Sequence, residues 1–400
     1  MKNPFYIYIY AFVLVIVVYQ FNWSNKFPEL SSGLILFLLF TFIASFAVGK
    51  FVEKNKLIQF EKLYIKNDRS LHTLTIIIYA GYLIEFIYHR TIPLIDLFRE
   101  GGIVYAEFGI PTFHVILVTF HSFVSITVFH LWLSDKKKYY AYIFLLLLIP
   151  SVLIFNRGMI IMILICCTYI FILSLKRMKF KNLISLICLA LLGLYIFGLM
   201  GNLRVNDAYG VEEDPFKSSL IMSIGGADSK FESSIIPNSF FWGYIYISSP
   251  LANFQSTVNE SSNSNNDIKI KDFISWYNNE ILYDFIGKRL ADEYRIERPD
   301  VVQISPELNV GTVYSRSYIY LEWLGPLLTF SFLILSSFIY IIVLRSIKSP
   351  FFLIAVSIYS TIFLFNTFSN MINFSGLSFQ LAYPLILTFI PSFKGLFYVR

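Results

Sequence analysis

Four arginines differ from the other basic residues of this chain because each one lies at the end of a long apolar run. They are Arg90, Arg157, Arg204 and Arg316. A guanidinium group is a planar fork that binds phosphate oxygens in pairs and tolerates partial burial, whereas a lysine ammonium is a strongly hydrated point charge. Arginines at the ends of membrane-spanning runs lie close to the depth of a lipid phosphate. The set therefore predicts a binding site for a pyrophosphate headgroup.

Three side chains are candidates for proton transfer near the same boundary. Glu85 and Glu322 fall within apolar runs, and His114 stands at the start of another. A carboxylate at membrane depth is costly and usually faces a cavity or a partner, which favours a functional role. The equal alternative is that each glutamate ends a helix and reaches the surface. His114 can likewise act as a base or bind phosphate, or it can be a hydrogen-bonded histidine between helices, as we expect for His121.

The composition determines which elements must position these residues. Of the 400 residues 56% are hydrophobic and only 14% charged, and the mean hydropathy is +0.64, so we expect an all-α polytopic membrane protein rather than soluble domains. The first apolar run lacks a small-residue cleavage site and is expected to remain as a helix. About ten runs are long enough to cross a bilayer. They lie near 5–23, 33–50, 72–90, 112–134, 139–155, 158–175, 182–200, 317–343, 351–366 and 376–393.

The distribution of charge orients these runs, since cytoplasmic loops carry an excess of Lys and Arg. Eighteen of the 32 basic residues fall in the predicted inner segments, and most of the eighteen are lysines. Both termini are expected to be cytoplasmic. The remaining basic residues, over half of them arginines, lie on the outer side. The net charge of +6 therefore reflects membrane topology and does not indicate binding to nucleic acid.

The chain divides into three parts on this reading. Helices one to seven span 1–200, one large periplasmic loop spans 201–316, and helices eight to ten span 317–400. Within the loop, apolar residues from Ile270 to Phe285 recur at helical spacing and predict an amphipathic helix at the membrane interface. Arg289, Arg295 and Arg298 stand near acidic residues of the loop and are expected to pair with them.

The outer loop is the only extramembrane segment large enough for a substrate site. No glycine-rich phosphate motif occurs in the short inner loops. A synthetic reaction on the outer side, where nucleotide sugars are absent, requires a substrate that is already activated. We expect no cofactor and no metal, because the acids are scattered and no His/Cys cluster occurs.

Several segments together resemble the Wzy-type oligosaccharide repeat-unit polymerase family, also called O-antigen polymerases. Their order and outer-face placement carry the resemblance, which covers most of the chain. The 201–316 loop is rather long for the family. Asn156 precedes Arg157, which we expect at a tight turn between the runs 139–155 and 158–175, where Gly158 allows the chain to turn closely. The matching segments are Glu85-Phe-Ile-Tyr-His-Arg90 with Ile92-Pro93, Phe108-Gly-Ile-Pro-Thr-Phe-His114, Asn156-Arg157-Gly158, Met200-Gly-Asn-Leu-Arg204, Gly243-Tyr-Ile-Tyr-Ile-Ser-Ser-Pro-Leu-Ala-Asn253, and Leu308-Asn-Val-Gly-Thr312 leading into Tyr320-Leu-Glu-Trp-Leu-Gly325.

The resemblance implies a membrane glycosyltransferase with a fold like that of the C-superfamily glycosyltransferases. Such an enzyme lies in the bacterial cytoplasmic (inner) membrane. It transfers a growing glycan from undecaprenyl pyrophosphate to a sugar hydroxyl of an incoming lipid-linked repeat unit, in the biosynthesis of lipopolysaccharide O-antigen or of a capsular or exopolysaccharide. Its partners are the undecaprenyl-pyrophosphate-linked oligosaccharide, membrane lipid, a chain-length regulator and a flippase.

Given this reaction, the candidate residues take specific roles. Arg204 and Arg157 stabilise the leaving pyrophosphate, supported by Arg90 and Arg316. The candidates for the base are, in order, Glu85, His114 and Glu322. Amides and phenols bind hydroxyls, and aromatic faces stack on sugar rings. The expected sugar contacts are Asn202, Tyr244, Tyr246, Asn253 and Asn309, all of which are also ordinary loop and interface residues.

Two other functions fit parts of the pattern. An O-antigen ligase shares the fold and the donor but transfers the finished glycan to a lipid A core, and a glycan profile after gene disruption distinguishes it from a polymerase. A flippase or transporter of lipid-linked oligosaccharide should have two similar halves, short loops and charges inside the bundle. The asymmetric loops of this chain favour the transferases.

Overall fold

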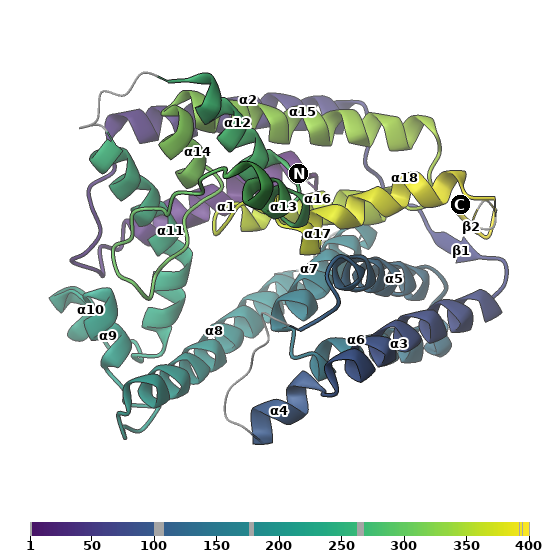
Figure 1. Cartoon of the computed structure of the whole chain (residues 1–400), viewed down its shortest axis with the longest axis horizontal. Coiled ribbons are helices and arrows are strands. Elements are labelled where there is room, and N and C mark those ends of the chain that lie inside the picture. The colour runs from purple at the N-terminus through teal and green to yellow at the C-terminus, as the bar shows by residue number, and fades with distance from the viewer. Residues whose placement is uncertain are drawn as a thin grey trace.

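The computed structural model of the chain describes residues 2–99, 108–175, 180–261, 268–391, 393 and 395–399. These residues form mostly helices (Figure 1). Within these residues, the first half of the chain contains eight helices and one strand. They are α1 (Pro4–Tyr19), α2 (Ser32–Lys54), α3 (Arg69–His89), α4 (Pro93–Arg99), α5 (Phe113–Asp135), α6 (Lys138–Leu153), α7 (Arg157–Ser174) and α8 (Phe180–Tyr209), with strand β1 (Leu63–Ile65) between α2 and α3.

The large loop is itself largely helical. Its helices are α9 (Leu220–Gly225), α10 (Ser229–Glu232), α11 (Phe240–Ser261), α12 (Ile270–Trp276), the π-helix η2 (Tyr277–Ile281) and α13 (Asp284–Tyr294). The last part holds α14 (Ser315–Leu321), α15 (Leu324–Ser346), α16 (Phe352–Phe365), α17 (Ser375–Ser378), the 3-10 helix η3 (Phe379–Leu381), α18 (Ala382–Phe389) and strand β2 (Phe397–Val399). The predicted amphipathic helix is present from Ile270, but it ends at Leu282, whose backbone is extended.

Among the described residues, six helices are long and apolar enough to cross a membrane, and four shorter helices are also apolar. The six are α2, α3, α5, α7, α15 and the part of α8 from Ile187 to Tyr209. The chain is therefore a mostly helical membrane protein with several candidate spans. Polar side chains start several of the helices, as Ser31 does where its Oγ accepts the N–H of Leu34 at α2.

Two predicted boundaries are wrong. The span predicted at 317–343 is divided, because Glu322 adopts a left-handed φ of 47° and separates α14 from α15. The span predicted to end at 200 continues to Tyr209 and is followed by Gly210 with φ +64°, a conformation that commonly ends a helix. Arg204 therefore lies on a helix and not in a loop.

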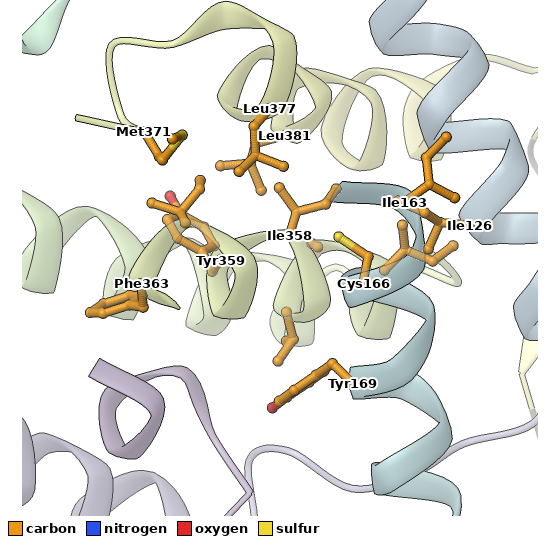
Figure 2. Packing of buried hydrophobic residues seen from close by; sticks show 14 of the residues in the cluster. Ile126, Ile163, Cys166, Tyr169, Ile358, Tyr359, Phe363, Met371, Leu377 and Leu381 are labelled. Atoms are coloured by element: carbon orange, nitrogen blue, oxygen red, sulfur yellow. The ribbon is translucent and has the colours of Figure 1, made fainter. Parts of the chain in front are cut away.

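The packed centre of the bundle is formed around α16. Twelve of its 14 residues are buried. Figure 2 shows Ile358 of α16 beside Cys166 of α7, with Tyr359 and Phe363 further along α16. By contrast α8 exposes most of its apolar side chains, including Cys188. An apolar helix with this exposure is suited to contact with lipid.

Segments that the charge pattern assigns to one side of the membrane meet in the structure. Strand β1 pairs antiparallel with β2, at the right of Figure 1. A ring N–H of His130 donates to the carbonyl oxygen of Glu61 at 2.9 Å, and Arg345 forms an ion pair with the carboxylate of Glu61. Predicted inner segments that are far apart in sequence are thus in direct contact.

Segments assigned to the other side meet as well, and they meet the large loop. The hydroxyl of Ser24 donates to the carbonyl oxygen of Gly225 at 2.6 Å. Arg289 of α13 donates to the hydroxyl of Thr112, just before α5. Both contacts join residues in or beside short predicted outer segments to 201–316.

Two glycines of α8 can be compared to test how this helix packs against Ser239, the residue before α11. A Cβ on Gly198 would overlap the carbonyl oxygen of Ser239, whereas a Cβ on Gly193 of the same helix would meet nothing within 4 Å. We expect Gly198→Ala to lower the free energy of unfolding by about 1–3 kcal/mol, since overpacking moves one backbone away from the other. Thermal unfolding in detergent should show a lower midpoint for Gly198→Ala and an unchanged or higher one for Gly193→Ala. Equal midpoints would contradict this packing.

Candidate active site

Glu85 and His114 form a buried pair between α3 and α5. Glu85 lies in the last turns of α3 and is fully buried. His114 is the second residue of α5, and its Nδ1 lies 2.9 Å from Oε2 and 3.1 Å from Oε1 of Glu85. Because an ionised carboxylate can only accept, Nδ1 carries the hydrogen and donates it. A neutral imidazole held in this way has its lone pair on Nε2.

The turn before α5 closes over this pair. The N–H of Ile110 donates to Glu85 Oε1 at 3.2 Å, and the N–H of Gly109 donates to Nε2 of His89 at 2.9 Å. Gly109 has φ +109°, and a Cβ there would overlap the ring of His114. Only glycine meets both conditions. The turn leaves the His114 side chain 22% exposed while Glu85 has no exposed surface.

Helix α13 lies against the same turn through Arg289, which donates to Thr112 as described above. This partner differs from our expectation that Arg289 pairs with an acid of the loop. Arg298 does interact electrostatically with an acid, Glu280, although the two form no ion pair within the described part of the chain. The long loop therefore contacts the turn that covers the Glu85–His114 pair.

Arg90 and Arg157 are both exposed at helix ends. Arg90 follows α3 in the left-handed region with φ 56° and lines a surface pocket of about 310 Å³. Arg157 begins α7, and its guanidinium carbon lies 5.1 Å from the centre of the Phe155 ring. The tight turn predicted before α7 is present, but Phe155 with φ 55° and not Gly158 supplies the left-handed residue, while the Asn156 side chain caps the helix.

Arg204 and Arg316 have different surroundings. Arg204 is exposed on α8, and its guanidinium donates a long hydrogen bond of 3.5 Å to the hydroxyl of Tyr246. Arg316 is mostly buried, lies 3.5 Å from the carboxylate of Glu280, and donates through Nε to the carbonyl oxygen of Pro299 at 3.0 Å. Arg316 is therefore already engaged with the protein, whereas Arg204 is accessible.

Three of the five predicted sugar contacts are buried and bonded within the protein. Asn202 accepts the indole N–H of Trp242 at 2.6 Å, and the Tyr244 hydroxyl accepts the backbone N–H of Trp23 at 3.1 Å. Asn253 donates to the carbonyl oxygens of Leu308 and Val310 at 2.6 and 2.7 Å. These bonds stabilise the loop, and a contact with sugar would require some of them to break.

The other two predicted contacts and the third base candidate are more accessible. Tyr246 is partly buried and stacks against Phe368, with 6.1 Å between ring centres, and Asn309 is exposed. Glu322 is exposed at the break between α14 and α15. It therefore adopts the helix-end position that the sequence left open, without a buried partner among the described residues.

Glu280 is a buried acid that the sequence did not single out. It lies in η2 and is only 1% exposed. Asn370 donates to Glu280 Oε2 at 2.9 Å and to the Glu280 carbonyl oxygen at 2.8 Å. Burial raises the pKa of this carboxyl above its usual 4.5, and the charge of Arg316 and the Asn370 hydrogen bond offset part of the rise. One available signal was the polar run Asn278-Asn279-Glu280, which interrupts the apolar spacing.

The structure thus brings some predicted residues together and leaves others apart. Glu85 contacts His114, Arg204 contacts Tyr246, and Arg316 contacts Glu280. Arg90 and Arg157 remain exposed on separate helix ends. Comparison with protein-family models, with curated proteins and with solved structures finds no match to this chain.

The raised pKa of Glu280 predicts a pH dependence of stability. Between pH 4.5 and the raised value the folded chain binds more protons than the unfolded chain, so the free energy of unfolding falls as pH rises through this interval. Glu280→Gln removes this contribution. Its free energy of unfolding relative to the wild type should therefore rise over the interval by up to about 1.4 kcal/mol per pH unit and then level off, and its thermal midpoint relative to the wild type should rise in parallel.

Thermal unfolding of purified protein across a pH series measures this difference. Glu293→Gln, on the exposed surface of α13, is the matched control and should follow the wild type at every pH. A Glu280→Gln variant that also followed the wild type would show that the carboxyl has an ordinary pKa in the folded chain.

Proposed function

We propose that this membrane protein is a glycosyltransferase that polymerises lipid-linked oligosaccharide repeat units at the outer leaflet of the bacterial inner membrane. The donor glycan is carried on undecaprenyl pyrophosphate, and the acceptor is a sugar hydroxyl of an incoming lipid-linked repeat unit. The observation that carries the proposal is the Glu85–His114 pair. A buried carboxylate orients a partly exposed imidazole at the ends of two apolar helices, under a segment of the large loop.

The proposed topology has about ten spans, both termini in the cytoplasm and the 201–316 segment in the periplasm. The contacts of Ser24 with Gly225 and of Thr112 with Arg289 support it, because they gather the short outer loops against this segment. The same contacts support a site on that side, where neither ATP nor a nucleotide sugar is present. An activated lipid-linked donor meets this condition.

The geometry favours His114 over Glu85 as the base. Glu85 has no exposed surface and already accepts hydrogen bonds from His114 and Ile110, so its oxygens cannot reach a substrate. His114 retains some exposure, and Nε2 is its proton-accepting atom. We assign His114 as the catalytic base and Glu85 as a positioning residue that fixes the tautomer and stabilises the imidazolium.

In the proposed reaction the acceptor oxygen forms a bond to the anomeric carbon of the donor while the bond from that carbon to the pyrophosphate oxygen breaks. The hydroxyl proton passes to His114 Nε2. The electron pair of the broken bond leaves with undecaprenyl pyrophosphate, whose charge is stabilised by the exposed guanidinium groups of Arg157 and Arg204, with Arg90 in support. Arg316 contributes less directly, because it is held by Glu280.

The reaction is tested with purified protein in proteoliposomes supplied with the lipid-linked repeat unit of its host. We expect a ladder of lengthened lipid-linked glycans, and a rate lower by about a hundredfold or more in Arg157→Ala and in Arg204→Ala because each removes charge near the leaving group. Arg69→Ala, at the opposite end of α3 from Arg90, is the control. Unchanged rates in both arginine variants would contradict their role.

Transfer of glycan only to a lipid A core would indicate a ligase. Movement of lipid without bond formation would indicate a transporter.

The same assay distinguishes the two members of the buried pair. His114→Ala removes the base and should lower the rate by about a hundredfold to ten-thousandfold. Glu85→Gln keeps the shape but lacks the charge that stabilises the imidazolium, so its rate should fall and its pH profile should shift. The His114→Ala and Glu85→Gln variants are assayed at temperatures below their thermal unfolding midpoints. His72→Ala, near the other end of α3 from Glu85, is the control. Full activity in His114→Ala would rule out this base.

A further inference from the structure

A polar pocket of about 330 Å³ lies between η2, α13 and the turn at Asn373. Two asparagines of η2, Asn278 and Asn279, form one wall with Asn373. Lys288 and Ala291 of α13 belong to another wall. None of the residues predicted from the sequence to bind sugar lines this pocket, so it is a separate place for a ligand.

The lining indicates a neutral, strongly polar ligand. Two acids, Asp284 and Asp292, are balanced by two bases, Lys288 and Arg298, so the formal charge of the lining is zero. Such a pocket does not select an anion. The amide, ammonium and guanidinium donors of the lining and its amide and carboxylate acceptors match the hydroxyls of a sugar. The volume is at the lower end of the range for small-molecule sites.

One wall of the pocket is held rigidly and contains an unpaired acceptor. Asn278 is 3% exposed, and its Nδ2 donates to the carbonyl oxygen of Gly287 at 3.0 Å and to Asn279 Oδ1 at 3.1 Å. Within the described part of the chain its Oδ1 has no hydrogen-bond partner. π-Helices such as η2 occur frequently at functional sites.

The opposite side of η2 is apolar. Tyr277 and Ile281 line a second pocket of about 260 Å³ together with Phe332 of α15 and Ile362 of α16. The same short helix therefore separates a polar pocket from an apolar pocket that is lined by the candidate span α15 and the shorter apolar helix α16. This arrangement suits an amphiphile with a sugar headgroup and a hydrocarbon chain.

We propose that the pocket between η2 and α13 binds one neutral sugar residue of the lipid-linked glycan, whose hydroxyls meet the amides and charged side chains of the lining. The proposal deepens the proposed function and rests on it for the identity of the glycan. It assigns sugar recognition to the second half of the large loop, whereas base and leaving-group chemistry belong to His114 and the exposed arginines.

The test uses the repeat-unit oligosaccharide released from the lipid carrier of the host by mild acid as the probe. Its binding to the purified full chain is followed by saturation-transfer NMR and by titration. We expect Ala291→Phe to fill the pocket and abolish binding, and Asp292→Ala, an exposed change that leaves folding intact, to weaken it by about tenfold. Glu293→Phe and Glu293→Ala, one position further along α13 and outside the lining, are the matched controls.

No binding by the wild type, or wild-type binding by both Ala291→Phe and Asp292→Ala, would overturn the sugar pocket. Displacement of the oligosaccharide by inorganic pyrophosphate would overturn its neutral character. Polymerisation with no binding in the pocket would remove this inference and leave the proposed function standing, whereas binding with no polymerisation would do the reverse.

Discussion

The cost of burying charge is the constraint on which the rest of this structure depends. In an apolar surrounding a carboxylate needs a charged or hydrogen-bonding partner, since its own hydration is lost. Among the described acids two are buried, Glu85 and Glu280, and each has such a partner, in His114 and Arg316 respectively. The other charges lie at helix ends and in loops, which is why the long apolar helices can lie against lipid. The two exceptions are therefore the places where chemistry is best sought.

Helix α13 connects these two places. Arg289 holds the turn over His114, while Gly287 lies so close to η2 that a Cβ on it would come within 2.6 Å of the carbonyl oxygen of Asn278. Asp284, at the start of the same helix, bonds to Ser375 of α17. A helix of only 11 residues thus contacts the cover of the candidate base and forms a wall of the polar pocket. Through these contacts of α13, the large loop has a defined position at the ends of the apolar helices.

Much of the architecture followed from residue patterns, and the exceptions have local causes. Apolar runs predicted the helices because a chain in lipid must satisfy its backbone hydrogen bonds internally. The break at Glu322 was missed because nothing in Tyr320-Leu-Glu-Trp-Leu marks a left-handed residue, and the extension of α8 to Tyr209 was missed because polarity was taken to end the helix. Helices can continue into polar sequence until a residue such as Gly210 ends them.

The sequence by itself predicted a helical membrane protein, the segments that group at each end of its helices, and Glu85, His114 and a few arginines as candidate site residues. Those conclusions depend on composition and spacing, which act locally along the chain. Only the tertiary structure decided that Glu85 is hidden behind His114, that Asn202, Tyr244 and Asn253 are bonded within the loop, and that Glu280 is buried beside Arg316. These facts depend on contacts between residues far apart in sequence, and burial is a property of the packed chain that no single residue carries.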